Sequence, residues 1–224
     1  MGHLVRSLAH LFAKQHAGPQ DTPREEHSTG QPNRGHASSP VKQEAASQPS
    51  RKEVLDYLGV LAKEYHLPSK LGSGVASAES SLMTQQTTPN YKTDRHGHFV
   101  RGKDGNKILT SVDYGLMQIN SSRIGHDLVK DAHGHPFKIG EEVKTNWQAN
   151  ARAGVAILAD AYHLATLEQG PGATEEDHAQ QAYSQYNGNE RARDRYLKNR
   201  ADGMPANKAD RNFLRRYREQ SGNQ

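Results

Sequence analysis

Several stretches of the chain repeat apolar residues at intervals of three and four positions, the spacing that places them on one face of an α-helix. Gly, Pro and Asn residues interrupt this pattern and separate the stretches from one another. The spacing predicts helices from Lys52 to His66-Leu67-Pro68 and over 145–168, 174–186, 189–199 and 205–218. The folded part of the chain is therefore predicted to be mainly α.

A shorter apolar run after Gly74, residues 75–83, is predicted to be a largely buried helix with Glu79 as its one carboxylate. The sequence then turns polar as far as residue 110. Within this polar stretch, residues 99–101 and 107–109 flank an Asp-Gly turn, which predicts a small β-hairpin. The expected fold class is thus mainly α with a small β element.

The first 51 residues follow a different pattern. Residues 1–17 have apolar side chains at helical spacing, which predicts a short amphipathic helix, whereas 18–51 is rich in Pro, Ser, Gln and Gly and predicts a disordered linker. We therefore expect a flexible N-terminal segment over 1–51, one folded domain over 52–218 and a tail over 219–224. The hydrophobic share of 33% and the mean hydropathy of -0.94 agree with a chain that packs only in part.

The composition excludes some kinds of chemistry and favours some kinds of partner. The chain has no Cys, which excludes a disulfide, a thiol nucleophile and a thiolate metal site. The net charge of +4 favours anionic partners, and for the basic residues of 191–218 a solvated helical face is favoured over a dedicated binding patch. Without a nucleic-acid-binding motif, nucleic acid is not an expected partner. No stretch approaches the roughly 20 apolar residues of a membrane span, and 1–17 is not a convincing signal peptide.

Four separated segments carry the functional signal. They are Ala78-Glu79-Ser80, the run DYGLMQIN from Asp113 to Asn120, Asn150 with Gly154 and Leu158, and Tyr186-Asn187-Gly188. In this order they resemble the goose-type-lysozyme-like, or soluble, lytic transglycosylases over about residues 52–190. The resemblance implies a lysozyme-like (α+β) catalytic domain that cleaves peptidoglycan glycan strands between N-acetylmuramic acid and N-acetylglucosamine. It implies no cofactor and no metal.

By the same resemblance, Glu79 is the general acid that then turns general base, and Tyr186 is the catalytic tyrosine beside it. A carboxyl that must stay protonated near neutral pH needs burial beside apolar groups, and the apolar sequence neighbours of Glu79 suit that need. Gln118 and Asn120 offer amide donors and acceptors to a sugar, while Gly115 and Met117 are also typical of close packing. The candidate substrate-binding residues are Ser80, Gly115, Met117, Gln118, Asn120 and Asn187.

The residue at position 120 bears on which product the expected reaction gives. True goose-type lysozymes have an aspartate there, and an amide cannot activate water as a carboxylate does. Asn120 therefore favours a transglycosylase, which closes the muramoyl C6 hydroxyl onto C1 and leaves a 1,6-anhydro end without water. Asp94, Asp104 and Asp113 are candidate second carboxylates, so a true muramidase, which is a hydrolase, stays open as the alternative.

Three further features have simple interpretations. The 34 residues between Glu79 and Tyr114 (80–113) are expected to form an enlarged hairpin lip over the cleft. His96-Gly97-His98 and His133-Gly134-His135 suggest a metal site, yet solvated loop histidines are favoured because no third ligand stands at a set spacing. Trp147 is expected to anchor the core.

The expected substrate lies in the periplasm or cell wall, and the chain shows no convincing export signal. We therefore expect delivery by another route. An antibacterial effector of a secretion system, a phage lysis enzyme and a virion-borne enzyme each fit, and a toxin of this kind requires an immunity protein. A non-catalytic wall-binding module on the same scaffold is the non-enzyme alternative, although Glu79 together with Tyr186 argues against it.

Overall fold

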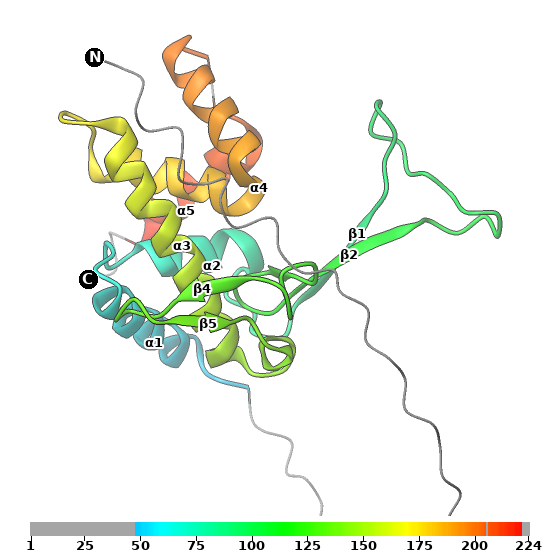
Figure 1. Ribbon diagram of the computed structural model, residues 1–224, viewed down its shortest axis with the longest axis horizontal. Helices are drawn as coiled ribbons and strands as arrows, with labels where there is room; N and C mark the ends of the chain where they lie inside the picture. The colour runs from blue at the N-terminus through cyan, green and yellow to red at the C-terminus, as the bar shows by residue number, and fades with distance from the viewer. Residues whose placement is uncertain (1–47, 205, 221–224) are drawn as a thin grey trace, which may run out of the picture. The chain divides into compact units, whose positions relative to one another are not determined.

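The computed structural model describes residues 48–204 and 206–220, and this part of the chain is mainly helical with a small antiparallel sheet (Figure 1). The helices are α1 (Arg51–Glu64), α2 (Leu71–Ser80), the short 3-10 helix η1 (Glu141–Lys144), α3 (Trp147–Gln169), α4 (Glu175–Ala201) and α5 (Lys208–Glu219). The strands are β1 (Thr87–Tyr91), β2 (Leu109–Tyr114), β3 (Ile119–Asn120), β4 (Leu128–Lys130) and β5 (Pro136–Lys138). The predicted helix over 1–17 and nearly all of the predicted linker lie outside the described residues.

Polar side chains set where four of the helices begin. Each accepts a hydrogen bond from the backbone N–H three positions later, which satisfies a donor that the helix leaves unpaired and contributes about 1 kcal/mol. The caps are Ser50 of α1, Asn146 of α3, Thr174 of α4 and Asn207 of α5. The predicted helices over 52–66 and 145–168 are confirmed, with starts that these caps move by one or two residues.

The predicted helix over 75–83 is wrong at both ends, because α2 begins and ends earlier. Gly74 lies inside α2. A Cβ on it would lie 3.3 Å from the Cα of Tyr217, so the glycine lets α5 pack closely against α2. Ser81 and Leu82 have φ angles of 55° and 67°, which end the helix. Met83 therefore lies beyond α2 and is exposed.

Although it is continuous in its backbone pattern, α4 folds back on itself. Tyr196 Oη donates to Gln180 Oε1 at 3.2 Å, a pair 16 residues apart, whereas a straight helix would separate them by about 24 Å. Ser184 Oγ likewise donates to the carbonyl oxygen of Ala192 at 3.1 Å. The sharp turn lies near Gly188, and the two halves run in different directions in Figure 1. The two helices predicted over 174–186 and 189–199 correspond to these halves.

The sheet has the order β1-β2-β3, and both pairings are antiparallel; β4 and β5 form a separate two-stranded sheet. The register places Asn90 of β1 opposite Ser111 of β2. It also places Asp113 of β2 opposite Asn120 of β3. Four polar side chains from three strands are therefore brought to one region of the sheet.

The hairpin predicted over 99–109 is confirmed in its turn and its antiparallel pairing, which is a bridge between Arg101 and Lys107 and not a pair of longer strands. Residues 92–108, which we name the arm, join β1 to β2 and project away from the helices (Figure 1). The arm contains two turns, closed by single bridges between Thr93 and Phe99 and between Arg101 and Lys107. Because two turns share so short a segment, neither leaves room for a strand of its own. The arm is part of the stretch 80–113 that was expected to form a lip, but none of its residues lines the cleft described below.

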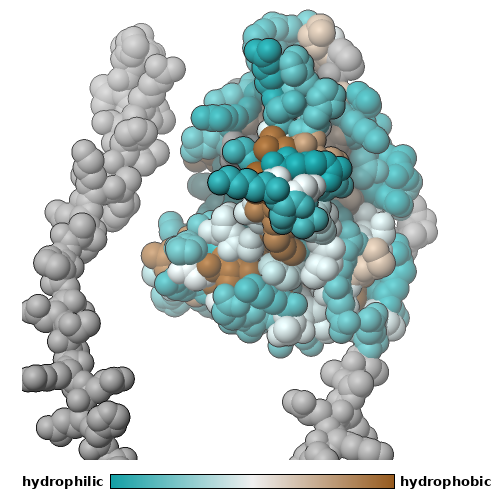
Figure 2. All heavy atoms as spheres, turned by 90° about the vertical axis from the view of Figure 1, so that its right-hand side faces the viewer, coloured by the Kyte–Doolittle hydropathy of each residue, from teal (hydrophilic) through white to brown (hydrophobic). Residues whose placement is uncertain are grey.

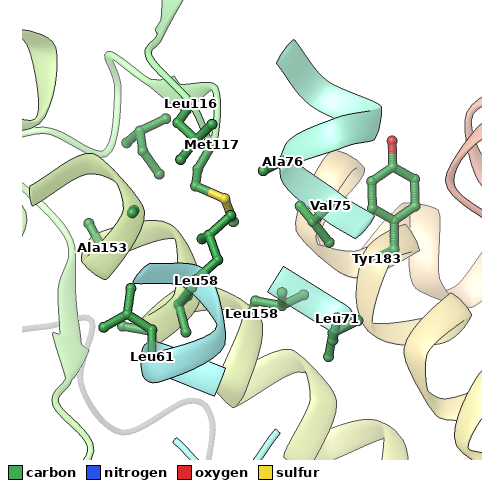
Figure 3. Packing of buried hydrophobic residues seen from close by; sticks show 14 of the residues in the cluster. Leu58, Leu61, Leu71, Val75, Ala76, Leu116, Met117, Ala153, Leu158 and Tyr183 are labelled. Atoms are coloured by element: carbon green, nitrogen blue, oxygen red, sulfur yellow. The ribbon is translucent and has the colours of Figure 1, made fainter. Parts of the chain in front are cut away.

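One cluster of buried apolar side chains joins the helices to the turn after β2. Figure 3 shows members from α1 (Leu58, Leu61), α2 (Leu71, Val75, Ala76), the turn (Leu116, Met117), α3 (Ala153, Leu158) and α4 (Tyr183). Trp147 packs partly buried against this cluster, edge to face with Tyr57 at 5.2 Å between ring centroids, so its predicted packing role is confirmed. Among the described residues, none of the helices has the length and apolarity that a membrane crossing needs.

Candidate active site

A polar cleft of about 470 Å³ opens where the end of α2, the three-stranded sheet and the turn of α4 meet. Its lining consists of Glu79, Asn90, Ser111, Asp113, Gln118, Ile119, Asn120, Ser122, Arg123, Ile157, Tyr186, Asn187 and Gly188. Six candidate residues named from the sequence are in this lining: Glu79, Asp113, Gln118, Asn120, Tyr186 and Asn187. Segments that are far apart in the sequence therefore meet around one open space.

Glu79 stands in the last turn of α2 with its carboxyl largely removed from water. Its Oε1 is buried and has no hydrogen-bond partner among the described residues. Burial raises the pKa of Glu79 to about 7, against the lowering effect of a hydrogen bond from Tyr183, and the negative charge of Asp113 raises this pKa further. A carboxyl with such a pKa is partly protonated at neutral pH, so it can donate a proton there and take one back.

Asp113 is the second carboxylate of the cleft, and two amides hold it in place. Asn90 Nδ2 donates to its Oδ2 at 2.8 Å, and Asn120 Nδ2 donates to its Oδ1 at 2.6 Å. Ser111 Oγ accepts hydrogen bonds from the same two amides, at 3.3 and 2.9 Å. The strand register described above builds this network, so the position of Asp113 is fixed by three strands.

The other two candidate second carboxylates are not in the cleft. Asp94 and Asp104 lie in the two turns of the arm, where each accepts hydrogen bonds from backbone N–H groups of its own turn. Neither contributes to the lining around Glu79. Of the three candidates named from the sequence, the structure brings only Asp113 to Glu79.

The tyrosine whose hydroxyl acts on the pKa of Glu79 is Tyr183, a residue outside the predicted motifs. Tyr186 lines the cleft, but its hydroxyl donates to the carbonyl oxygen of Met117 at 2.5 Å. Tyr183 in turn accepts a hydrogen bond from Asn187 Nδ2 at 3.2 Å, which holds its hydroxyl in place. Burial raises the pKa of both tyrosines, which keeps their hydroxyls protonated. The spacing of three between the two tyrosines places them on one helical face and could have indicated Tyr183.

The turn after β2 is built around the buried side chain of Asn150. Asn150 Nδ2 donates to the carbonyl oxygen of Tyr114, and its Oδ1 accepts from Met117 N–H, both at 2.8 Å. Gly115 has a φ of 73°, and a Cβ there would lie 2.6 Å from Asn150 Nδ2, so no other residue fits. A Cβ on Gly154 would lie 2.5 Å from that of Met117. Asn150 and Gly154, the residues of α3 that belong to the predicted motifs, thus shape the turn after β2, and this turn carries part of the cleft wall.

Three predicted substrate-binding residues, Ser80, Gly115 and Met117, are buried and do not line the cleft. Ser80 is 2% exposed, and its hydroxyl donates to the carbonyl oxygen of Leu116 at 2.8 Å, which fastens α2 to the turn. Met117 packs in the core with no exposed surface. Packing and turn formation occupy these residues in this structure, and the prediction that they bind substrate stays untested.

Gln118 and Asn120 line the cleft, but their amides are engaged within the protein. Gln118 Oε1 accepts from Thr88 Oγ1 at 2.6 Å, and its Nε2 donates to the carbonyl oxygen of Gly115 at 2.8 Å. The amide of Asn120 bonds to Asp113 and Ser122. In this geometry the two residues hold the wall of the cleft and orient Asp113; the prediction that they bind sugar stays untested.

Arg123 is the one cation among the described residues that line the cleft, and the sequence analysis did not single it out. Its guanidinium lies 3.3 Å from Asp127 in a partly exposed ion pair. Its positive charge also acts on Tyr186, where it opposes the rise in pKa. Its place three residues after Asn120 could have indicated it.

The histidine pairs lie on exposed turns, as their simpler interpretation predicts. His96 and His98 occupy one tip of the arm, and His133 and His135 lie at the turn between β4 and β5, with ring centroids 6.2 Å apart in each pair. Within the residues that the structure describes, no group of three or more His, Asp or Glu side chains could hold a metal ion.

No family model matches the chain, and neither the curated proteins nor the solved structures searched contain a match to it. Because a fold alone does not define an activity, the function is argued from the residues of the cleft.

Proposed function

We propose that this protein cleaves the glycan strands of bacterial peptidoglycan as a lytic transglycosylase with a lysozyme-like fold. The observation that carries the proposal is Glu79, a carboxyl with a pKa of about 7 in a cleft that also holds Asp113. Two carboxyls in unlike surroundings, one apolar and one rich in hydrogen bonds, are typical of enzymes that cleave glycosidic bonds. The four sequence motifs support peptidoglycan as the substrate.

In the first step, Glu79 donates its proton to the glycosidic oxygen, and the bond between that oxygen and the muramoyl C1 breaks. Positive charge develops at C1, and Asp113, fixed by Asn90 and Asn120, stabilises that charge. In the second step, the muramoyl O6 bonds to C1 while its proton passes to the Glu79 carboxylate. The product has a 1,6-anhydro end, no water is consumed, and Glu79 is again protonated.

Tyr183 and Asn187 are positioning residues in this scheme. The Tyr183 hydroxyl stabilises the Glu79 carboxylate and so limits how far burial raises the pKa of Glu79. This suits a group that gives a proton in one step and takes one in the next. Tyr186 fixes the backbone at Met117 beside the cleft instead of bonding to Glu79.

A muramidase is the second candidate, and the position of Asp113 favours it. Retaining glycosidases use a second carboxylate as nucleophile or as electrostatic stabiliser before water attacks C1. The preference for a transglycosylase rested on Asn120, yet Asn120 orients another carboxylate in the same cleft. Reaction in ¹⁸O-labelled water distinguishes the two, because a hydrolase places the label in the new end and a transglycosylase does not.

Release of soluble fragments from dye-labelled sacculi tests the proposal, with Glu79→Gln compared with the parent. Glu64→Gln, an exposed position at the end of α1, is the matched control. We expect the parent and Glu64→Gln to release dye at equal rates and Glu79→Gln to release none. Binding to sacculi without release by the parent would favour the non-catalytic wall-binding module.

The proposed substrate sets where the protein acts. We propose the periplasm or the cell wall, reached by a secretion system or by a phage route. An antibacterial effector of this type needs an immunity protein as a partner in the cell that makes it. Co-expression of the periplasm-targeted protein with genes from its own neighbourhood tests this: rescue of growth by one of them supports it.

A further inference from the structure

The arm is a defined structure and not a loose loop. Main-chain hydrogen bonds run through it from Lys92 N–H to the Ile108 carbonyl at 2.8 Å and from Val100 N–H to the Lys92 carbonyl at 2.9 Å. In its two turns, Asp94 and Asp104 accept backbone N–H groups at 2.8 to 3.1 Å. The carboxylates that the arm contains are thus used to form its tips.

The arm carries most of the net charge of the chain. It has five basic residues and two acidic ones, a net charge of +3, within a chain of net charge +4. The basic residues, all exposed, are Lys92, Arg95, Arg101, Lys103 and Lys107. Because both acidic side chains bond to their own turns, the outward charge of the arm is positive, and its partner is expected to be anionic.

Exposed apolar surface accompanies this charge. Phe99 is 51% exposed and Leu109, at the base of the arm, is 54% exposed. Tyr91 and Phe99 meet edge to face, and Lys107 Nζ lies 3.9 Å from the centroid of the Phe99 ring. Figure 2 views the molecule from the side of the arm and shows hydrophobic patches beside strongly hydrophilic ones on this face. Such a mixed surface suits a partner with both apolar and anionic groups.

The arm is continuous with the catalytic cleft. It leaves the sheet at β1 and β2, and the same two strands carry Asn90, Ser111 and Asp113 of the cleft lining. A polymer whose cleavage point lies between Glu79 and Asp113 therefore passes the base of the arm where it leaves the cleft. Sugars fill the cleft itself, so the groups that reach the arm are the substituents that the sugars carry.

We propose that the arm binds the carboxylates of the peptides attached to the muramoyl residues of the glycan strand in the cleft. This inference rests on the proposed function, because it takes the occupant of the cleft to be peptidoglycan. The attached peptides carry free carboxylates beside apolar side chains, which matches the basic and apolar groups of the arm. A glycan without its peptides offers far fewer carboxylates to the cations of the arm.

Pelleting with insoluble sacculi tests the proposal, with Glu79→Gln as the background in every sample to prevent cleavage. The arm variant combines Lys92→Gln, Arg95→Gln and Lys103→Gln. The control variant combines Lys63→Gln, Lys138→Gln and Lys208→Gln, exposed residues outside the arm, and has the same net charge. Three exposed ion pairs of ordinary strength correspond to about a tenfold change in affinity. We expect the arm variant to bind sacculi about tenfold more weakly and the control variant to bind like the background protein.

Soluble peptide competitors in the same pelleting assay identify the ligand. We expect a stem peptide with free carboxylates to displace the Glu79→Gln protein from intact sacculi, and the same peptide with its carboxylates amidated to leave the protein bound. Equal binding of the arm and control variants to intact sacculi would overturn the proposal, as would equal displacement by the two peptides. Stronger binding to vesicles of anionic phospholipid than to sacculi would overturn it too and would assign the arm to a membrane.

Activity on a short, peptide-free glycan separates this proposal from the proposed function. With Glu79 intact, the arm variant is expected to cleave that glycan at the parent rate and intact sacculi more slowly. If the parent cleaves neither substrate, the proposed function fails. If the parent cleaves both and the arm variant matches it on both, only the inference about the arm fails.

Discussion

The hydroxyl of Tyr183 lies near enough to the carboxyl of Glu79 to lower the pKa of that carboxyl, and it accepts a hydrogen bond from Asn187. Tyr183 is itself buried. Its hydroxyl stabilises the charged form of Glu79, while burial of Glu79 destabilises it. The balance of these two effects sets the pH range in which the acid can work.

Tyr183→Phe removes the stabilising effect and leaves the burial. The pKa of Glu79 then rises, so the protonated acid persists to higher pH. A hydrogen bond to a charged group is worth enough to move the alkaline limb of the activity profile upward by about one pH unit. Tyr196→Phe, a buried tyrosine whose hydroxyl bonds to Gln180, is the control and leaves the profile unchanged. A pH profile of Tyr183→Phe that matches the parent would contradict the role given to Tyr183.

Asp113→Asn removes the negative charge opposite Glu79. We expect kcat to fall on the order of a hundredfold, because the charge that stabilises the transition state is lost. The alkaline limb also moves down, since the charge of Asp113 contributes to the raised pKa of Glu79. Asp56→Asn, on the exposed face of α1, should change neither quantity. If the parent and Asp113→Asn had equal rates, Asp113 would have no part in the reaction.

Gly115→Ala tests how the turn after β2 is held. The new Cβ would lie 2.6 Å from Asn150 Nδ2, at a φ of 73° that L-residues rarely adopt. Strain and overpacking together are expected to lower the free energy of unfolding by about 3 kcal/mol. Gly125 has a φ of 77° but open space around it, so Gly125→Ala costs the strain alone, about 1 kcal/mol. Urea denaturation measures the free energy of unfolding of both variants. Equal losses of this free energy would show that Asn150 does not confine the turn.

The raised pKa of Glu79 also predicts how stability depends on pH. The folded chain holds this proton more tightly than the unfolded chain, in which the ordinary value is 4.5. The stabilising contribution is therefore complete below about pH 4.5 and is lost as the pH rises through about 7. The side chain of Glu79→Gln cannot titrate. The free energy of unfolding of this variant, relative to that of the parent, should therefore grow by up to about 3 kcal/mol between pH 5 and pH 8. Parallel stability curves for the two proteins would contradict the raised pKa.

The helices could be predicted from the sequence because each buries an apolar stripe, and that stripe recurs at helical spacing. The position of Glu79 on a buried helix followed from the same pattern. The ends of α2 could not be predicted, since Gly74 looks like a helix breaker until Tyr217 is seen to pack against it. Close contact between helices, and not local preference, decides that boundary.

The network around Asp113 could not be predicted either. It depends on which residues of β1, β2 and β3 face one another, and a polar strand of few residues specifies its register only weakly. The candidate substrate residues Ser80, Gly115 and Met117 stand next to cleft residues in the sequence but are buried. A motif shows which residues occur together, and it does not separate those that form the turn from those that face the ligand.

The central claim is that Glu79 is the acid and base of glycan cleavage, and mass spectrometry of the fragments released from purified peptidoglycan tests it most directly. The parent is predicted to release 1,6-anhydromuropeptides, and Glu79→Gln is predicted to release none. Fragments heavier by one water would retain Glu79 as the acid but assign the protein as a muramidase that uses Asp113. Release of the same fragments by Glu79→Gln, or no release by the parent, would contradict the account.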